Sequence, residues 1–171
     1  MCDFHSILGI AIGENYELRH DSTNSHSDMA GSLENKPNRK PIIFEVECSA
    51  EKLAACSSVD DIKSSIIRNF GECPPPLVLK IVRHYQFVKE ALVDGRHLCD
   101  GGYFSDTKKY SDVWCKAIAL GVHVTMPAVF DGNLYVYGSA KLDAPELKEV
   151  GGNLYVSGSA KLDAPLLKTV N

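Results

Sequence analysis

The sequence predicts an α+β protein in which a small antiparallel sheet with helices is followed by a short C-terminal β-solenoid of 20-residue repeats. The strongest observation is the tandem repeat itself. Residues 132–151 read GNLYVYGSAKLDAPELKEVG and residues 152–171 read GNLYVSGSAKLDAPLLKTVN, and the two units are identical at 16 of 20 positions. A fixed period of about 20 to 50 residues is typical of solenoids. Before the repeats, some segments alternate apolar with polar residues and others show helical spacing, which indicates strands and helices in one region.

The first elements predict a small sheet. Residues 4–12 are largely apolar, a Gly-Glu-Asn turn follows, and residues 16–19 alternate apolar with polar side chains, which is typical of a β-hairpin. Residues 41–48 form another alternating run, and we expect this strand to join the hairpin in one sheet. Between these segments, residues 22–28 are rich in helix-capping side chains, which favours the start of a short helix.

Three further segments carry helical signals. Serines and aspartates at residues 57–61 precede apolar residues at helical spacing, which predicts a helix that ends near Gly71. Residues 77–92 show the i, i+3, i+4, i+7 pattern of a helix lying on a core. A last helix is expected over residues 111–120, directly before the repeats.

The chain is expected to divide into an α+β domain at residues 1–120 and the repeats at residues 121–171. Within each repeat, alternation around two turn segments predicts two short half-buried strands. Five apolar side chains of each unit should point inward and stack on their counterparts, about 4.8 Å away. These are Leu134, Val136, Leu142, Leu147 and Val150 in the first unit, and Leu154, Val156, Leu162, Leu167 and Val170 in the second.

Both ends of this stack need cover, because solenoids normally require about three or more repeats. Residues 122–127 are expected to form a degenerate half-coil on the N-terminal side, since Val122 and Phe130 occupy the positions that Leu142 and Val150 take one repeat later. The helical domain should cover that same end. The other end has no polar cap, so its strand edge is expected either to pair with a second copy, giving a homodimer, or to continue in further repeats.

The composition excludes several classes of protein. The 171 residues carry a formal net charge of −4, and the longest basic run is the short stretch at residues 36–40, which argues against a nucleic-acid partner. No apolar stretch approaches the roughly 20 residues of a membrane span, so we expect a cytoplasmic protein without a membrane partner. The six cysteines are scattered without a CxxC pair. This spacing argues against a zinc knuckle and a disulfide scaffold, and we expect reduced thiols with no metal and no cofactor.

The repeat resembles the tandem GNLYVxGSAKLDAPxL units of uncharacterised phage and prophage proteins, and more distantly the leucine-rich-like coils of receptor L-type domains. This resemblance is specific over residues 132–171, about a quarter of the chain. The opening MCDFHS with NSHS at residues 24–27 also resembles the start of phage-encoded proteins. The resemblance implies a viral or mobile-element origin and a location in the host cell cytoplasm, where small acidic proteins often act on host defence systems.

Cys2 is the candidate nucleophile. Its small side chain permits removal of Met1, which would expose the thiol beside its own α-amine, the arrangement by which N-terminal nucleophile hydrolases activate a cysteine. His5 and His26 could supply or orient the base. The alternative is a half-buried cysteine at the start of a strand, with no catalytic role. His84, which stands alone in an expected helix, is interpreted as structural.

Two other groups of polar residues have competing interpretations. Residues 24–28 contain Ser, His and Asp, but a catalytic triad is defined in space, and helix capping explains the segment. Its alternative role is a polar ligand-binding loop, with Asn24 and Ser25 as binding residues. The His-Leu-Cys-Asp stretch at residues 97–100 could hold a metal or an anion, but its spacing is not that of a standard site, and a turn is favoured.

Tyr135, Tyr137 and Tyr155 are the candidate binding residues. They should form an exposed aromatic ladder on a rigid surface, and tyrosine is enriched at interface hot spots. The alternative is a ladder that only stabilises the coil. We therefore expect a non-enzymatic, phage-type interaction protein that binds a host protein or itself, such as an anti-CRISPR or other anti-defence factor. The competing hypothesis is a small hydrolase or ligand-binding enzyme with its site around Cys2.

Overall fold

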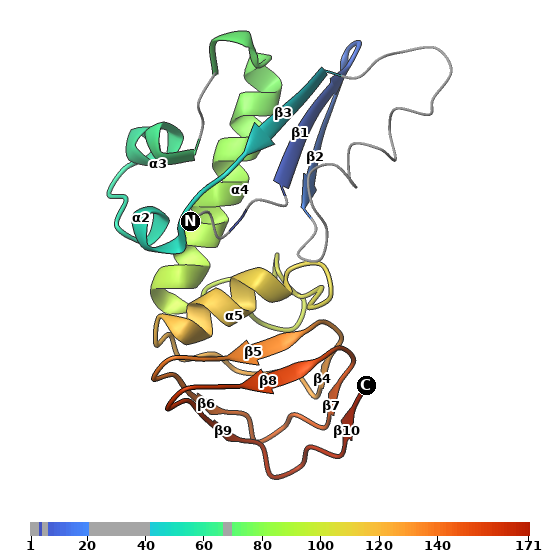
Figure 1. The fold of residues 1–171 in the computed structure, drawn as a ribbon. Coiled ribbons are helices and arrows are strands. Elements are labelled where there is room, and N and C mark those ends of the chain that lie inside the picture. Colours follow the sequence, from blue (N-terminus) through green and yellow to red (C-terminus); the bar gives the residue numbers. More distant parts are fainter. Residues whose placement is uncertain (1–3, 5–6, 21–41, 67–69) are drawn as a thin grey trace. The chain divides into compact units, whose positions relative to one another are not determined.

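The fold combines helices and strands in two compact units. A computed structural model describes residues 4, 7–20, 42–66 and 70–171. The units are Met1–Lys89 and Glu90–Asn171, whereas the sequence placed its domain boundary at residue 120. The first unit holds a small antiparallel sheet and the second holds small parallel sheets, which confirms the α+β class (Figure 1). The short helix expected at residues 22–28 lies outside the described residues.

The sheet of the first unit has the strand order β2-β1-β3. Its strands are β1 (Ile7–Ile12), β2 (Asn15–His20) and β3 (Ile42–Val46). The central strand β1 pairs antiparallel with both neighbours. A two-residue turn joins β1 to β2, and its Gly13 has a φ of 59°, a conformation that glycine adopts without a steric penalty. The predicted hairpin and its third strand are therefore confirmed.

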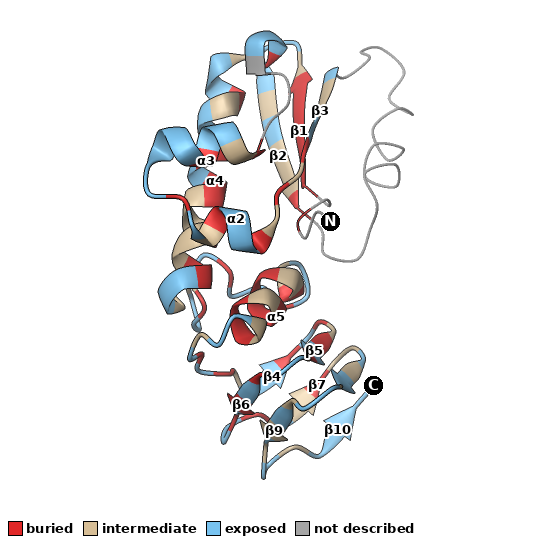
Figure 2. Cartoon of the chain, turned by 60° about the vertical axis from the view of Figure 1, so that its left-hand side comes forward, coloured by how far each residue is buried: buried red, intermediate tan, exposed pale blue. Residues whose placement is uncertain are grey.

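Strand β1 is buried on both faces (Figure 2). On one face, a Cβ added at Gly9 would lie 3.0 Å from Ile81 Cδ1 and 3.2 Å from Leu77 Cδ2, so the glycine allows helix α4 (Pro75–Asp94) to approach closely. Leu8 and Ile10, which alternate with Gly9 and so face the other way, form a second apolar cluster. Burial on two faces explains why the sequence of this strand is continuously apolar rather than alternating.

Each helix predicted in the described part of the chain is present, although the first of them ends at Ile66 rather than near Gly71, and one further helix forms. The helices are α2 (Ala50–Ala54), α3 (Val59–Ile66), the 3-10 turn η1 (Phe70–Glu72), α4 and α5 (Ser111–Ala119). Helix α2 was not predicted, although Ser49 caps it by accepting the Lys52 N–H at 3.2 Å. The proline run does not end the preceding helix, since α3 ends at Ile66. Pro75 and Pro76 instead begin α4, where proline is tolerated because first-turn N–H groups need no helical partner. None of the described helices is long and apolar enough to cross a membrane.

A reciprocal capping box holds the start of α3. The Asp61 N–H donates to Ser58 Oγ at 3.1 Å, and the Ser58 N–H donates to Asp61 Oδ2 at 2.9 Å. Ser57 also donates its hydroxyl to this carboxylate at 2.7 Å, and hydrogen bonds from Ser57 and Ser58 lower the pKa of Asp61. The serines and the aspartate from which the sequence predicted this helix therefore stabilise its start through these hydrogen bonds.

Ser58→Ala is expected to lower the free energy of unfolding by about 1 kcal/mol, because the Asp61 N–H loses its capping acceptor. Urea denaturation followed by circular dichroism measures this change. Ser64→Ala, at an exposed position of the same helix, is the matched control and should be neutral or slightly stabilising, since alanine has the higher helix propensity. Equal losses in the two variants would contradict the capping interpretation.

The two repeats of the second unit stack in parallel, with each strand beside its counterpart in the other repeat. Each repeat contributes three strands, one more than predicted. They are β5 (Leu134–Val136), β6 (Lys141–Asp143) and β7 (Glu149–Val150) in the first repeat, and β8 (Leu154–Val156), β9 (Lys161–Asp163) and β10 (Thr169–Val170) in the second. Strand β5 pairs with β8, β6 pairs with β9, and β7 pairs with β10, each residue facing its counterpart.

The half-coil before the repeats is present but begins later than predicted. Strand β4 (Val129–Phe130) pairs with β7 and places Phe130 in the expected register. The expected role of Val122 is wrong: strand β6 pairs only with β9 among the described residues, and the Val122 N–H donates to the Ala117 carbonyl at the end of α5. The register of the repeats starts at Ala128, whose carbonyl accepts the Lys148 N–H at 2.8 Å.

Burial differs sharply between the two repeats. The five inward side chains of the first repeat are each at most 4% exposed, as predicted. Their counterparts keep the register but not the burial, because the second repeat has no described strand beyond it. Val156 is 44% exposed and Val170 is 47% exposed, and Leu154, Leu162 and Leu167 are half-buried. Among the described residues, the second repeat therefore leaves apolar side chains half-buried or exposed, and Figure 2 colours β10 as exposed.

Candidate functional site

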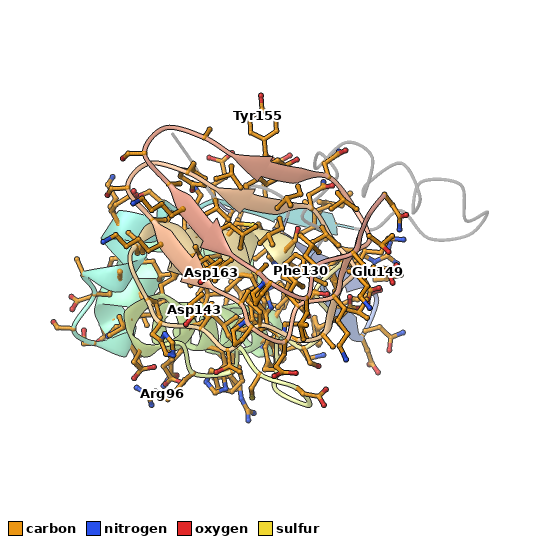
Figure 3. All side chains as sticks on the ribbon, turned by 90° about the horizontal axis from the view of Figure 1, so that it is seen from below. Arg96, Phe130, Asp143, Glu149, Tyr155 and Asp163 are labelled. Atoms are coloured by element: carbon orange, nitrogen blue, oxygen red, sulfur yellow. The ribbon has the colours of Figure 1, made fainter. Side chains whose placement is uncertain are left out.

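The most exposed aromatic pair of the repeats lies on the outward face of β5 and β8. Tyr135 and Tyr155 are direct register partners, and their ring centroids are 6.5 Å apart with the rings tilted by 52°. Tyr135 is 40% exposed and Tyr155 is 63% exposed, and Figure 3 shows Tyr155 projecting away from its strand. The predicted tyrosine ladder is thus present between Tyr135 and Tyr155 as two exposed rings that are tilted against each other.

Tyr137 lies at the end of this pair but in a different environment. Lys116 of α5 places its Nζ 5.5 Å from the Tyr137 ring centroid, which is a cation–π contact, and the tyrosine is half-buried. The second repeat has Ser157 at the corresponding position, so the Tyr137 column does not continue. We define the tyrosine surface as Tyr135, Tyr137 and Tyr155, with Lys116 at its α5 edge. Lys116 gave no signal in the sequence, because it lies in the helix before the repeats and belongs to no motif.

Helix α5 supports the tyrosine surface through a sulfur. The Tyr135 N–H donates to Cys115 Sγ at 3.3 Å, and the thiol donates to the Asn133 carbonyl at 3.6 Å. The cysteine of α5 therefore provides hydrogen-bond partners for backbone groups at this edge of β5. Burial raises the pKa of the Cys115 thiol to about 12. The thiol is therefore protonated at neutral pH and acts as a structural contact rather than as a nucleophile.

Cys115 is expected to resist alkylation in the native protein at pH 8. Iodoacetamide reacts with the thiolate, and the raised pKa leaves almost no Cys115 thiolate at this pH. Cys99 is exposed and free, so it should be alkylated first and serves as the internal control. Peptide mass spectrometry after a limiting dose measures both sites, and Cys115 should react only after denaturation. Native labelling of Cys115 at the rate of Cys99 would show that α5 does not hold β5 in this way.

A second exposed face of the repeats carries charge rather than aromatic rings. On β6 and β9, Lys141 faces Lys161 and Asp143 faces Asp163 in register. Figure 3 shows the two aspartates on neighbouring strands. Parallel in-register stacking places like charges side by side, and each lysine is separated from an aspartate only by the leucine between them. This face is chemically distinct from the tyrosine surface.

The predicted catalytic residues Cys2, His5 and His26, and the predicted binding residues Asn24 and Ser25, lie outside the described residues. The nearest described position is Phe4, which is fully buried. Its N–H donates to the Cys48 carbonyl at 3.2 Å, and its carbonyl accepts the Tyr85 hydroxyl at 3.3 Å. Phe4 is therefore anchored beside the middle of α4.

A pair of buried histidines adjoins this anchor. His20 at the end of β2 is 5% exposed, His84 of α4 is 2% exposed, and their ring centroids are 5.4 Å apart. His84 also meets the neighbouring Tyr85 ring edge-on at 5.6 Å. The sequence did not indicate this pair, because the two histidines are far apart along the chain and neither belongs to a motif. The pair adds two titratable side chains to the region that carries Phe4.

The stretch at residues 97–100 forms a turn, as favoured from the sequence. His97 has a φ of 70° and its Nε2 lies 2.6 Å from Glu90 Oε2, so its imidazole is engaged with a carboxylate of α4. Over the described part of the chain, no group of three His, Cys, Asp or Glu side chains could hold a metal ion. The predicted alternative of a metal site at His97, Cys99 and Asp100 therefore does not form.

Comparisons with known proteins give this surface no precedent. No protein-family model, no curated protein and no solved structure matches the chain.

Proposed function

We propose that the two repeats are coils of a β-solenoid and that the protein is a non-enzymatic interaction protein that binds its target through the tyrosine surface. The observation that carries this proposal is the stacked pair of Tyr135 and Tyr155, each at least 40% exposed on a short parallel sheet. Aromatic residues exposed side by side on a regular backbone are a common feature of binding surfaces.

The tyrosine surface is rigid, so binding a partner should cost little conformational entropy. Tyrosine has only two rotatable side-chain torsions, so ordering it on binding costs little. The strand beneath Tyr135 is fixed on one edge by Cys115 and on the other by β8. Lys116 and Tyr137 extend the aromatic pair with a cation and a further ring. The surface thus offers hydroxyls, ring faces and a cation in a rigid arrangement.

The partner that we propose is a host protein in the host cell cytoplasm, bound by a phage-type anti-defence factor such as an anti-CRISPR protein. The resemblance of the repeats and of the N-terminal motifs to phage and prophage proteins supports this origin. The net charge of −4 supports a protein target with cationic groups over a nucleic acid.

The experiment compares two double variants in a pull-down from bacterial lysate, followed by titration of the recovered protein. Tyr135→Ala with Tyr155→Ala should raise the dissociation constant of the recovered partner by roughly 30-fold or more, the effect of losing a hot spot. Lys141→Ala with Lys161→Ala changes the other exposed face of the same repeats and should leave the affinity unchanged. Equal affinities for the wild type and the tyrosine variant would contradict the proposal.

A second candidate function is a small hydrolase that uses Cys2 as an N-terminal nucleophile. The observation that favours it is the buried pair of His20 and His84 next to Tyr85, whose hydroxyl holds the Phe4 carbonyl. Phe4 is close to Cys2 in the sequence. General-base activation of a nucleophile requires a titratable side chain within reach, and the two imidazoles belong to the same region as the anchored Phe4.

Intact-mass measurement with a limiting dose of iodoacetamide tests this candidate. The hydrolase predicts loss of Met1 and selective alkylation of Cys2, with a slower reaction in His84→Gln. Tyr85→Phe removes the hydroxyl that holds Phe4 and is the matched change without an imidazole. Retention of Met1 in the purified protein would rule out the N-terminal nucleophile.

A further inference from the structure

The open side of the second repeat has features of a protein–protein interface. We define this open edge as strands β8, β9 and β10, which have neighbours on the side of the first repeat and none on the other side among the described residues. Val156 is 44% exposed and Val170 is 47% exposed there.

The second repeat is less charged than the first. Glu146 and Glu149 of the first repeat correspond to Leu166 and Thr169 of the second. The first repeat lies between β4 and the second repeat, yet it has the more charged sequence. Charged residues are depleted at the core of protein interfaces, so these two changes favour a protein-covered edge.

Head-to-tail stacking of copies is hindered, because two of the three strands on the opposite side of the stack already have neighbours within the same unit. Helix α5 takes the edge of β5 through Cys115, and β4 takes the edge of β7. Only β6 has no second neighbour among the described residues, so a copy could offer a single strand on that side. We therefore expect self-association to join two open edges, which is the isologous arrangement of a two-fold dimer.

The backbone of β9 is oriented for such pairing. The Lys161 N–H donates to the Ala140 carbonyl at 2.9 Å, and the Asp163 carbonyl accepts the Ala144 N–H at 2.7 Å, so both residues direct their backbone groups toward β6. Alternate residues of a strand point their backbone groups in opposite directions. The N–H and C=O of Leu162 therefore face the open edge, centred on the strand.

The charges of β9 are complementary to a second copy. Continued parallel stacking would place lysine beside lysine and aspartate beside aspartate, as in the pair of β6 and β9. Antiparallel pairing about Leu162 instead places Lys161 opposite the partner's Asp163, and Asp163 opposite the partner's Lys161. Opposite charges across antiparallel strands are stabilising, and like charges are destabilising.

We propose that the protein forms a two-fold homodimer in which β9 pairs antiparallel with β9 of a second copy, with Leu162 opposite the partner's Leu162. The two Leu162 residues exchange both backbone hydrogen bonds, and the half-buried apolar side chains of the two second repeats join in one core. The pairing strand β9 is distinct from β5 and β8, which carry Tyr135 and Tyr155, and the dimer does not depend on the host-protein partner.

Sedimentation equilibrium of the full chain over a range of concentrations, at low ionic strength, tests the dimer. The wild type should show a monomer–dimer equilibrium. Lys161→Asp should raise the dimer dissociation constant roughly two- to thirty-fold, because both symmetric pairs become like-charged. Within one chain the same change is favourable, since the introduced carboxylate faces Lys141. Weaker association therefore cannot be attributed to loss of folding.

Two further variants make the outcome decisive. Lys141→Asp introduces the same opposite-charge contact within the chain but away from the open edge, and it should leave the dissociation constant unchanged. The charge exchange Lys161→Asp with Asp163→Lys restores opposite charges across the two-fold axis and should recover the wild-type value. A wild-type mass that stays monomeric at all concentrations, or a dimer that is insensitive to Lys161→Asp, would overturn the proposal.

Discussion

Phe130→Ala is expected to lower the free energy of unfolding by about 3–5 kcal/mol, the usual cost of removing a fully buried phenylalanine. The ring is completely buried and meets the Trp114 ring edge-on, with 5.9 Å between centroids. Its strand β4 pairs with β7 and covers that edge of the first repeat. The substitution therefore leaves a cavity between α5 and the repeats and weakens the N-terminal cover of the stack.

Urea denaturation followed by the fluorescence of Trp114, the single tryptophan, reports on this change directly. The neighbouring Val129 is the matched control, because it belongs to the same strand but is 44% exposed. Val129→Ala should change the free energy of unfolding by about 0.5 kcal/mol or less. Similar losses for the two variants would show that β4 does not bury Phe130 against the tryptophan.

The repeats were the most predictable part of the fold because the same pattern of residues occurs twice. Two units with the same residues at the same positions can satisfy the same inward pattern only in register, and Leu134 and Tyr135 do face Leu154 and Tyr155. The third strand of each repeat was missed, since Glu149–Val150 offers a single inward side chain and no alternation. This two-residue strand forms because it pairs with β4 and β10, and such pairing cannot be predicted from the local sequence.

Elements and contacts set by tertiary structure were the ones that the sequence could not reveal. Helix α2 has only five residues, too few for a helical period, and Ser49 was its only signal. The meeting of His20 with His84 depends on where β2 ends along α4. Likewise, the thiol of Cys115 reaches the backbone of Tyr135 only because α5 lies along β5. In the last two cases the contact depends on a partner from another element, which the local sequence does not indicate.

The different burial of the two repeats shows how position overrides sequence. Val136 is fully buried and Val156 is 44% exposed, although the residues are identical and occupy equivalent positions. Identity at 16 of 20 positions therefore specifies register and direction of the side chains but not their solvent exposure. Exposure depends on what stacks on each coil, and this is why the open edge became apparent only from the structure.

Gly132→Ala is expected to destabilise the protein by about 1–3 kcal/mol, the usual cost of overpacking a filled position. A Cβ at Gly132 would lie 2.4 Å from the Thr107 carbonyl oxygen and 2.8 Å from Ser111 Cβ. The first of these atoms belongs to the backbone, so relief requires the chain before α5 to move. That segment also fixes the half-coil, because the Asp131 N–H donates to Thr107 Oγ1 at 2.8 Å. The clash thus falls on the junction between α5 and the first repeat.

Gly71→Ala is the matched control, because it reduces the backbone freedom of a glycine without introducing a steric clash. A Cβ at Gly71 meets no atom within 4 Å and its φ is not positive, so this variant should be neutral or slightly stabilising by reducing the entropy of the unfolded chain. Thermal and urea denaturation of both variants measure the difference. If the two variants had equal stability, Gly132 would not be confined by the Thr107 backbone. A selective loss in Gly132→Ala would instead show that the helix and the repeat fold as one packed unit.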